Sequence, residues 1–263
     1  MGVDGDRHFI ERMTWQQVAR RIGDGAAAIL PIGAAAKQHG FHLPLNTDRL
    51  QAEWLAARIA EPVDAMIWPT LTYGHYPAFV AYAGSSSLSA STFEMLVHEV
   101  AAGILGSGCG KLLVLNTGIS TLAPVDRALS RLNTSRAMHV WTQGGPRYPR
   151  VAKALAQQGH GSHADELETS LMLALAPHLV DMARAEASPT VKENTPGALT
   201  PSDPNSPNYS RSGSYGDPTL ATSAKGEMLL AAMLDDLKEQ IAAFVAKPAA
   251  VEPRIAAMQS LSR

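Results

Sequence analysis

Short apolar runs alternate with longer amphipathic segments along most of this chain. Ala26–Ile32 and Lys111–Asn116 are short, mostly apolar runs next to glycines or polar turns, which is typical of buried strands. Ala65–Tyr73 and Ala137–Thr142 are further strand candidates. Since such runs recur between helical patterns, they predict the strands of one central sheet.

The amphipathic segments predict the helices that flank this sheet. Thr14-x-x-Gln17 is a capping-box pattern, so a helix is expected over Thr14–Gly23. Four further helices are expected from their length and spacing of apolar residues: Asp48–Ala60, Ser91–Gly106, Ala164–Arg184 with Pro177 as an interruption, and Lys225–Ala246. The sequence therefore predicts one α/β domain over residues 1–263, with a mostly parallel central sheet between helices.

One long segment departs from this alternation. Ala187–Pro218 holds six of the chain's 17 prolines together with many serines and asparagines. Two interpretations stay open, a mobile surface loop and a lid or assembly arm, because long loops without secondary structure in compact domains often serve function. We expect the segment to pack over the mouth of a pocket or against a neighbouring subunit. Residues 247–263 are expected to form a C-terminal tail.

Composition excludes several classes of protein. The chain has 263 residues, 46% of them hydrophobic, and a net charge of -2, which argues against disorder and against a nucleic-acid binder held by a basic field. The lone Cys109 excludes an intrachain disulfide and a cysteine zinc cluster. No apolar run reaches the roughly 18 residues of a membrane span, and Met1–Thr14 is too polar for a secretory signal. We expect a soluble, cytoplasmic protein with no nucleic-acid or membrane partner.

Polar segments with catalytic potential follow the predicted strands. In an open α/β sheet, ligands bind beyond the carboxyl ends of the strands. Gly33–Asp48 and Asn116–Thr121 follow two of those strands, and Gly161–Ser170 leads into a predicted helix. The first and third segments are rich in His, Asp and Glu. Such side chains converging from separate loops are typical of a hydrolytic metal site.

The order and spacing of these residues match a known family. The most specific pieces are Gln38-His39-Gly40-x-His42-Leu43-Pro44 with Thr47-Asp48, and His163-Ala164-x-Glu166-x-Glu168-Thr169-Ser170. Shorter matches run from Pro31-Ile32-Gly33 near the start to Gly216-Asp217-Pro218 and Lys225-Gly226-Glu227 near the end. On these motifs the chain resembles the creatininase family of metal-dependent amidohydrolases along nearly its whole length.

The resemblance implies a metal site that is altered in this chain. Family enzymes hold two divalent metals, and the resemblance carries a ligand role to His39, a bridging role to Asp48 and a carboxylate role to Glu166 or Glu168. Lys37 stands where the family has a glutamate, and Gly118 stands where the family has a histidine. Both missing ligands belong to the same metal, so one half of the site is retained. A lysine ammonium beside Asp48 supplies part of the lost positive charge, without Lewis acidity.

These substitutions predict a reduced site. We expect at most one divalent transition metal (Zn, Mn or Fe), held by His39, Asp48 and Glu166, the last preferred over Glu168. The catalytic candidates are His163 for proton transfer, Lys37 for the developing oxyanion, and Glu168. The candidate substrate contacts are His42, Asn116 and Ser120.

Structural explanations stay open for these assignments: His39 can be a loop histidine, and Lys37 can point to solvent or pair with any acid. Asp48 or Thr47 can cap the following helix, the two glutamates can complement a helix dipole, and His163 can be a structural loop residue.

Three functions stay open on this evidence. The first is a hydrolase that acts on a cyclic or linear amide C–N bond of a small molecule with one metal. The second is a metal-free enzyme that uses Lys37 as base or nucleophile. The third is a non-catalytic relative that binds a ligand or serves in an assembly. The resemblance also implies a homo-oligomer, often a hexamer.

Overall fold

Four parallel strands form the central sheet in the order β2-β1-β3-β4. The computed structural model describes residues 7–188 and 197–247. The strands span Ala28–Ile32 (β1), Met66–Ile67 (β2), Leu112–Asn116 (β3) and Ala137–Trp141 (β4). The register pairs Ile32 of β1 with Asn116 of β3, so these two strands end side by side. The predicted α/β fold with a parallel sheet is confirmed.

Alternate side chains of each strand enter two separate cores, because successive side chains of a strand point to opposite faces. Ile29 of β1 and Leu113 of β3 belong to one buried cluster. Leu30 and Val114, the next residues along, belong to the other cluster. The strands are buried on both faces, which explains why they are continuously apolar in sequence.

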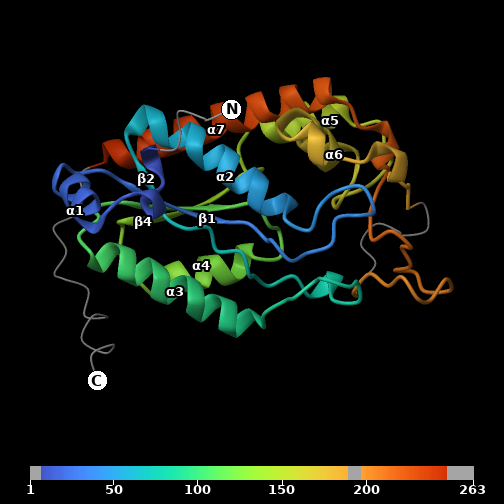
Figure 1. Cartoon of the computed structure of the whole chain (residues 1–263), viewed down its shortest axis with the longest axis horizontal. Helices are drawn as coiled ribbons and strands as arrows, with labels where there is room; N and C mark the ends of the chain where they lie inside the picture. The colour runs from blue at the N-terminus through green and yellow to red at the C-terminus, as the bar shows by residue number, and fades with distance from the viewer. Residues whose placement is uncertain (1–6, 189–196, 248–263) are drawn as a thin grey trace.

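Helices cover both faces of this sheet (Figure 1). One layer contains α2 (Thr47–Ala60), α5 (Tyr148–Leu155), α6 (Glu166–Leu175) and α7 (Ser223–Ala246), and the other contains α3 (Ala90–Gly106) and α4 (Leu122–Ser130). The remaining helix, α1 (Trp15–Gly23), has the predicted capping box between Thr14 and Gln17. Single 3-10 turns occur at Ile10–Arg12, Glu61–Val63, Pro77–Phe79, Pro177–Leu179, Met182–Arg184 and Pro218–Leu220.

Several predicted elements were wrong in extent. The predicted strand Ala65–Tyr73 is reduced to the two residues of β2, and α4 and α5 were not predicted. The predicted helix Ala164–Arg184 ends at Leu175, since Ala176 has φ -150° and ψ 61° and Pro177 follows it. Ser89, rather than a serine inside the helix, caps α3.

The start of α2 also differs from the expected capping. The N-cap residue is Asn46, which makes no side-chain capping bond, and the helix begins at Thr47. Thr47 Oγ1 donates a hydrogen bond to the carbonyl of Pro44. The Asp48 carboxylate is therefore not needed at the helix end and turns to other partners.

The sheet order places a crevice between β1 and β3. The chain leaves β1 towards β2 on one side and leaves β3 towards β4 on the other, so the strand order reverses at this point. Loops that diverge from such a reversal open a ligand site at the carboxyl ends of the strands. None of the helices among residues 7–188 and 197–247 is both long and apolar enough to cross a bilayer. The expected tail 247–263 lies outside the described residues from position 248 onwards.

Candidate active site

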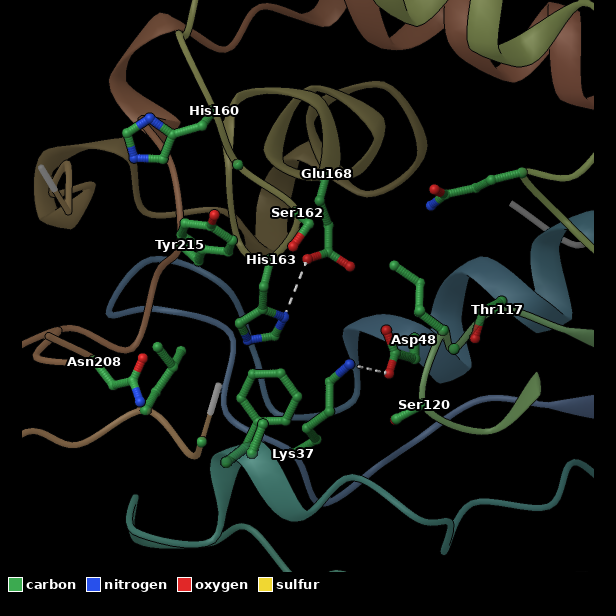
Figure 2. Close-up of a pocket in the computed structure, with 18 residues that line it drawn as sticks. Lys37, Asp48, Thr117, Ser120, His160, Ser162, His163, Glu168, Asn208 and Tyr215 are labelled. Carbon is green, nitrogen blue, oxygen red and sulfur yellow. Dashed lines mark ion pairs between the residues drawn. The ribbon is translucent and has the colours of Figure 1, made fainter. Parts of the chain in front are cut away.

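A cavity of about 570 Å³ opens at the carboxyl ends of β1 and β3. Its walls come from the loops after β1, β3 and β4, from residues 160–163, and from residues 197–215 of the long Pro/Ser/Asn-rich segment. Figure 2 shows Lys37, Asp48, His163 and Glu168 directed towards one another in the middle of this cavity. Segments far apart in the sequence thus bring the charged groups together.

A buried ion pair joins two of these groups. Lys37 Nζ lies 2.7 Å from Asp48 Oδ2, and both side chains are about nine-tenths buried. Burial alone would raise the pKa of the Asp48 carboxyl, but Lys37 and His39 outweigh burial and hold it well below its usual range. Lys37 Nζ also lies 5.1 Å from the centre of the Phe79 ring. Lys37 therefore faces the cavity, as the substitution argument expected.

The neighbouring histidine, His39, has a fixed orientation. Its Nδ1 lies 2.9 Å from the carbonyl oxygen of Lys37, and because a carbonyl oxygen only accepts, Nδ1 carries a proton and donates. The other ring nitrogen, Nε2, lies 3.1 Å from Asp48 Oδ1 and 3.8 Å from Glu168 Oε1. A lone pair facing two carboxylates repels them, so this position favours a cation between the three groups.

His163 is held in the complementary way. Its Nε2 donates to the carbonyl oxygen of Gln38 at 2.8 Å, and its Nδ1 lies 3.7 Å from Glu168 Oε2. Burial, followed by the charges of Lys37 and His39, lowers the pKa of His163 well below its ordinary value. The neutral ring therefore presents the Nδ1 lone pair to Glu168.

These groups fit a divalent transition metal. One ligand atom each from His39, His163 and Glu168 lie within 4.8 Å of one another. Each histidine donates its outer N–H to a backbone carbonyl, which is the arrangement that fixes the tautomer of metal-binding histidines. Two imidazoles with one carboxylate is also a donor set that such metals accept.

The preference for Glu166 over Glu168 as ligand is corrected by the structure. Glu166 is fully buried, and its carboxylate contacts Lys225 Nζ at 2.5 Å and the backbone N–H groups of Gln157 and Gln158 at 2.8 Å each. Residues two apart on a helix point about 200° apart, so only one of the two glutamates reaches the cavity. Glu168 is the one that lines it.

The candidate substrate contacts are only partly brought to the cavity. Ser120 lines it, and Ser120 Oγ donates to the carbonyl of His75 at 2.7 Å. His42 is buried away from the lining, with Nε2 2.7 Å from Thr169 Oγ1, and burial followed by the charge of His39 lowers its pKa to about 4. The Asn116 side chain orders its own turn by accepting from the Gly118 N–H at 3.1 Å and from Thr121 Oγ1 at 2.8 Å. His42 and Asn116 are not among the residues that line the cavity, so the structure does not place them as the predicted substrate contacts.

Other parts of the wall were missed by sequence reasoning. Phe79, Gln143, Leu199 and Tyr215 line the cavity but belong to no recognisable ligand spacing. The only sequence signal was the composition of Ala187–Pro218, which marked that segment as a candidate lid. Its described part packs over the cavity, as expected: the Leu199 N–H donates to the carbonyl of Ala78 at 2.9 Å, and the Tyr215 N–H to that of His163 at 2.8 Å.

Comparison with known proteins decides the family. The model of the Creatininase family, described as creatinine amidohydrolase, matches residues 11–241. This chain belongs to the creatininase family. The creatinine amidohydrolase of Pseudomonas putida is 26% identical over 89% of this chain and 95% of that protein. The mycofactocin precursor peptide peptidase of Mycobacterium tuberculosis (strain ATCC 25618 / H37Rv) is 26% identical over 84% of this chain and 86% of that protein.

Solved structures of the family share the fold. A crystal structure of creatinine amidohydrolase has a TM-score of 0.79 with 24% identity over 92% of this chain and 99% of that chain. Another such structure is described as "Creatininase Mn", and a mutant creatininase is described as the Zn-Zn type. At Gly118 this creatininase-family chain has no side chain to offer a metal, although Gly118 lines the cavity beside Lys37 and Asp48.

Proposed function

We propose that this creatininase-family chain hydrolyses an amide C–N bond of a small molecule with one divalent transition metal ion. The observation that carries the proposal is the convergence of His39, His163 and Glu168 on one point in the cavity. This ligand set replaces the one expected from sequence, because Glu166 is engaged elsewhere and His163 faces Glu168. When bound, the metal would supply Lewis acidity and a water of lowered pKa.

Lys37 and Asp48 act as a unit in this proposal. Asp48 stays ionised because its pKa is held low, so it is a poor base and serves as a fixed negative charge beside His39. Lys37 directs one N–H to Asp48 and has two further N–H groups for the cavity. Those donors are placed to stabilise negative charge that develops on a substrate carbonyl oxygen. Lys37 therefore supplies part of the charge that the lost second metal would carry.

The reaction can be proposed more specifically than the substrate. The curated relatives include proteins named for action on creatinine and on a precursor peptide. Both names concern C–N bond hydrolysis, so we place this chain among amide hydrolases without carrying either substrate over. The homo-oligomer and the cytoplasmic location expected from sequence remain proposals.

A second candidate is a non-catalytic relative that binds a ligand. The observation that favours it is the Lys37–Asp48 pair, which satisfies both charges without a metal. In that case no metal lies between His39 Nε2 and Asp48 Oδ1, which are 3.1 Å apart.

Metal content distinguishes the two candidates. The protein is expressed in medium supplemented with Zn²⁺ and Mn²⁺, and metal per chain is measured by mass spectrometry after gel filtration. About one metal per chain, together with hydrolysis that stops with a chelator and returns with the metal, supports the proposal. Two metals per chain contradict the single site. No metal, with no amide hydrolysed, favours the non-catalytic relative.

A further inference from the structure

The proposed reacting groups, Lys37, His163 and Glu168, lie in the middle of the cavity rather than at its end. Figure 2 shows Lys37, His163 and Glu168 between two sets of lining residues, with Tyr215 and Asn208 on one side and Thr117 and Ser120 on the other. A bond positioned at the reacting groups would therefore have space on both sides. This placement limits the shape of the substrate, an inference that rests on the proposed function.

One side of the cavity has an aromatic and aliphatic wall, beside the polar side chains of His160, Ser162 and Asn208. The ring of Phe79 lies 4.1 Å from the ring of His163, so the aromatic wall begins at the reacting groups themselves. Phe79 and Tyr215 pack against the buried Leu199 in one cluster. Farther along, the rings of Tyr215 and His160 lie 5.6 Å apart. A planar apolar group would contact ring faces and an aliphatic side chain over this whole distance.

Most of the residues on the other side are small or polar. Gly118 contributes only backbone there, and Ser120 Oγ is already bonded to the carbonyl of His75. The Thr117 hydroxyl is likewise bonded to the carbonyl of Ile32. Gln143 and Ile119, which is 54% exposed, complete this side. A small polar substituent fits this part of the cavity better than a ring does.

The size of the cavity also favours a substrate with a substituent on each side of the scissile bond. About 570 Å³ lies within the range of roughly 300–1,000 Å³ that holds drug-sized ligands. A small ring with the amide inside it places its atoms on one side of the reacting groups and leaves the other side to water. A linear amide places one substituent on each side and fills both.

We infer that the substrate is a linear amide with an aromatic or branched apolar group on one side of the scissile bond and a small polar group on the other. The apolar group lies against Phe79, Leu199 and Tyr215. Hydrolysis of such an amide adds water across the C–N bond, with hydroxyl to the carbonyl carbon and a proton to the nitrogen, and yields a carboxylic acid and an amine.

The test measures binding and hydrolysis separately. Three probes are titrated by calorimetry into metal-supplemented protein: N-benzoylglycinamide, N-acetylglycinamide and creatinine. We expect the benzoyl probe to bind about tenfold or more tightly than the acetyl probe, since burying a phenyl ring stabilises a complex by about 1.5–3 kcal/mol. Creatinine is expected to bind more weakly than the benzoyl probe. Equal affinities, tighter binding of creatinine, or no detectable binding of any probe would overturn the inference.

Two variants locate the apolar group. Leu199→Asp places a charge in the aromatic side, and it should remove most of the preference for benzoyl over acetyl. Val80→Asp is the matched control, because Val80 is adjacent to Phe79 in sequence and 53% exposed, and does not line the cavity. If Leu199→Asp fails to fold by circular dichroism, Leu199→Ser is used with the same expectation. A benzoyl preference that survives the Leu199 substitution contradicts the assignment of this side.

Failure of the inference and failure of the proposed function give different results. If the benzoyl preference is seen but none of the amides is hydrolysed, the binding inference stands and the proposed hydrolase fails. If small amides are hydrolysed with no benzoyl preference, the hydrolase stands and the inference fails.

Discussion

Lys37 Nζ and Asp48 Oδ2 lie 2.7 Å apart in a nearly buried ion pair in the middle of the cavity. Asp48 also faces His39, and the pair lies beside Gly118. The contact explains how the buried Asp48 carboxylate stays ionised. Its energetic importance can be measured directly.

Removing the Lys37 ammonium should destabilise the fold. Lys37→Met leaves Asp48 buried beside no cation, and breaking a buried pair in this way costs about 3–5 kcal/mol. We expect a loss of that size in urea unfolding with a chelator present. Lys111→Met is the control, because Lys111 is also buried but lies over Phe244, with no ion pair recorded for it in the described part of the chain. Equal effects of the two substitutions would show that the Lys37–Asp48 contact contributes nothing specific.

The two glutamates of α6 should separate metal binding from stability. Glu168→Gln removes the carboxylate that faces His39 and His163. It should weaken metal affinity at least about tenfold, the loss seen when interactions around a metal site are removed. Glu166→Gln weakens the contact with Lys225 and should lower the melting temperature while the metal stays bound. Metal content per chain and thermal unfolding are measured on both variants. If Glu166→Gln loses metal while Glu168→Gln keeps it, Glu166 is the ligand instead.

Restoring the two lost ligands together should be better tolerated than restoring one. Lys37→Glu alone places a second carboxylate beside Asp48 without a cation, so we expect a less stable protein with no additional metal. Adding Gly118→His supplies the missing imidazole. Gly118 is not among the described glycines with positive φ, but a Cβ there would lie 2.7 Å from Thr121 Oγ1, so the Thr121 side chain must shift.

The comparison is made on metal content and on melting temperature with and without Zn²⁺. The double variant should bind more metal than Lys37→Glu and gain more stability from Zn²⁺. A double variant that gains neither would show that the surrounding side chains no longer support a second site.

Acid sensitivity should depend on Asp236, which lies far from the metal ligands in sequence. Its carboxylate accepts hydrogen bonds from the backbone N–H groups of Arg147 and Tyr148 and pairs with the Arg147 side chain at 2.9 Å. Burial opposes ionisation, but these partners lower the pKa of Asp236 below its ordinary value of 3.8. The folded state therefore releases this proton more readily than the unfolded chain. The contribution is complete above the ordinary value and is lost as the pH falls through the folded pKa.

Asp236→Asn should cost about 2–3 kcal/mol at pH 7, as expected when a buried charged hydrogen-bond acceptor is removed. The free energy of unfolding of the variant should also fall less than that of the parent from about pH 5 to about pH 3, because the ordinary carboxyl pKa lies in this range. Asp235→Asn is the control, because Asp235 is the exposed neighbour on α7. Parallel stability curves for parent and Asp236→Asn across this range would contradict the prediction.

Local patterns were sufficient for much of this structure. The apolar runs Ala26–Ile32 and Lys111–Asn116 became β1 and β3, because a strand buried on both faces must be apolar at every position. The capping box at Thr14 appears as predicted, since it depends on residues three apart. The family motifs likewise placed Lys37 and Asp48 together, which the ion pair bears out.

Tertiary structure decided which of the candidate residues face the cavity. The sequence favoured Glu166 over Glu168 as the metal ligand, and only the rotation of α6 against Lys225 and α7 turns Glu168 to the cavity. It offered His163 for proton transfer and His42 as a substrate contact, and only their packing buries His42 on Thr169 and turns His163 to Glu168. The aromatic side of the cavity joins Phe79 to Leu199 and Tyr215 across more than a hundred residues. Such long-range contacts leave no periodic signal in a sequence, because periodicity reports only which face of a local element is buried.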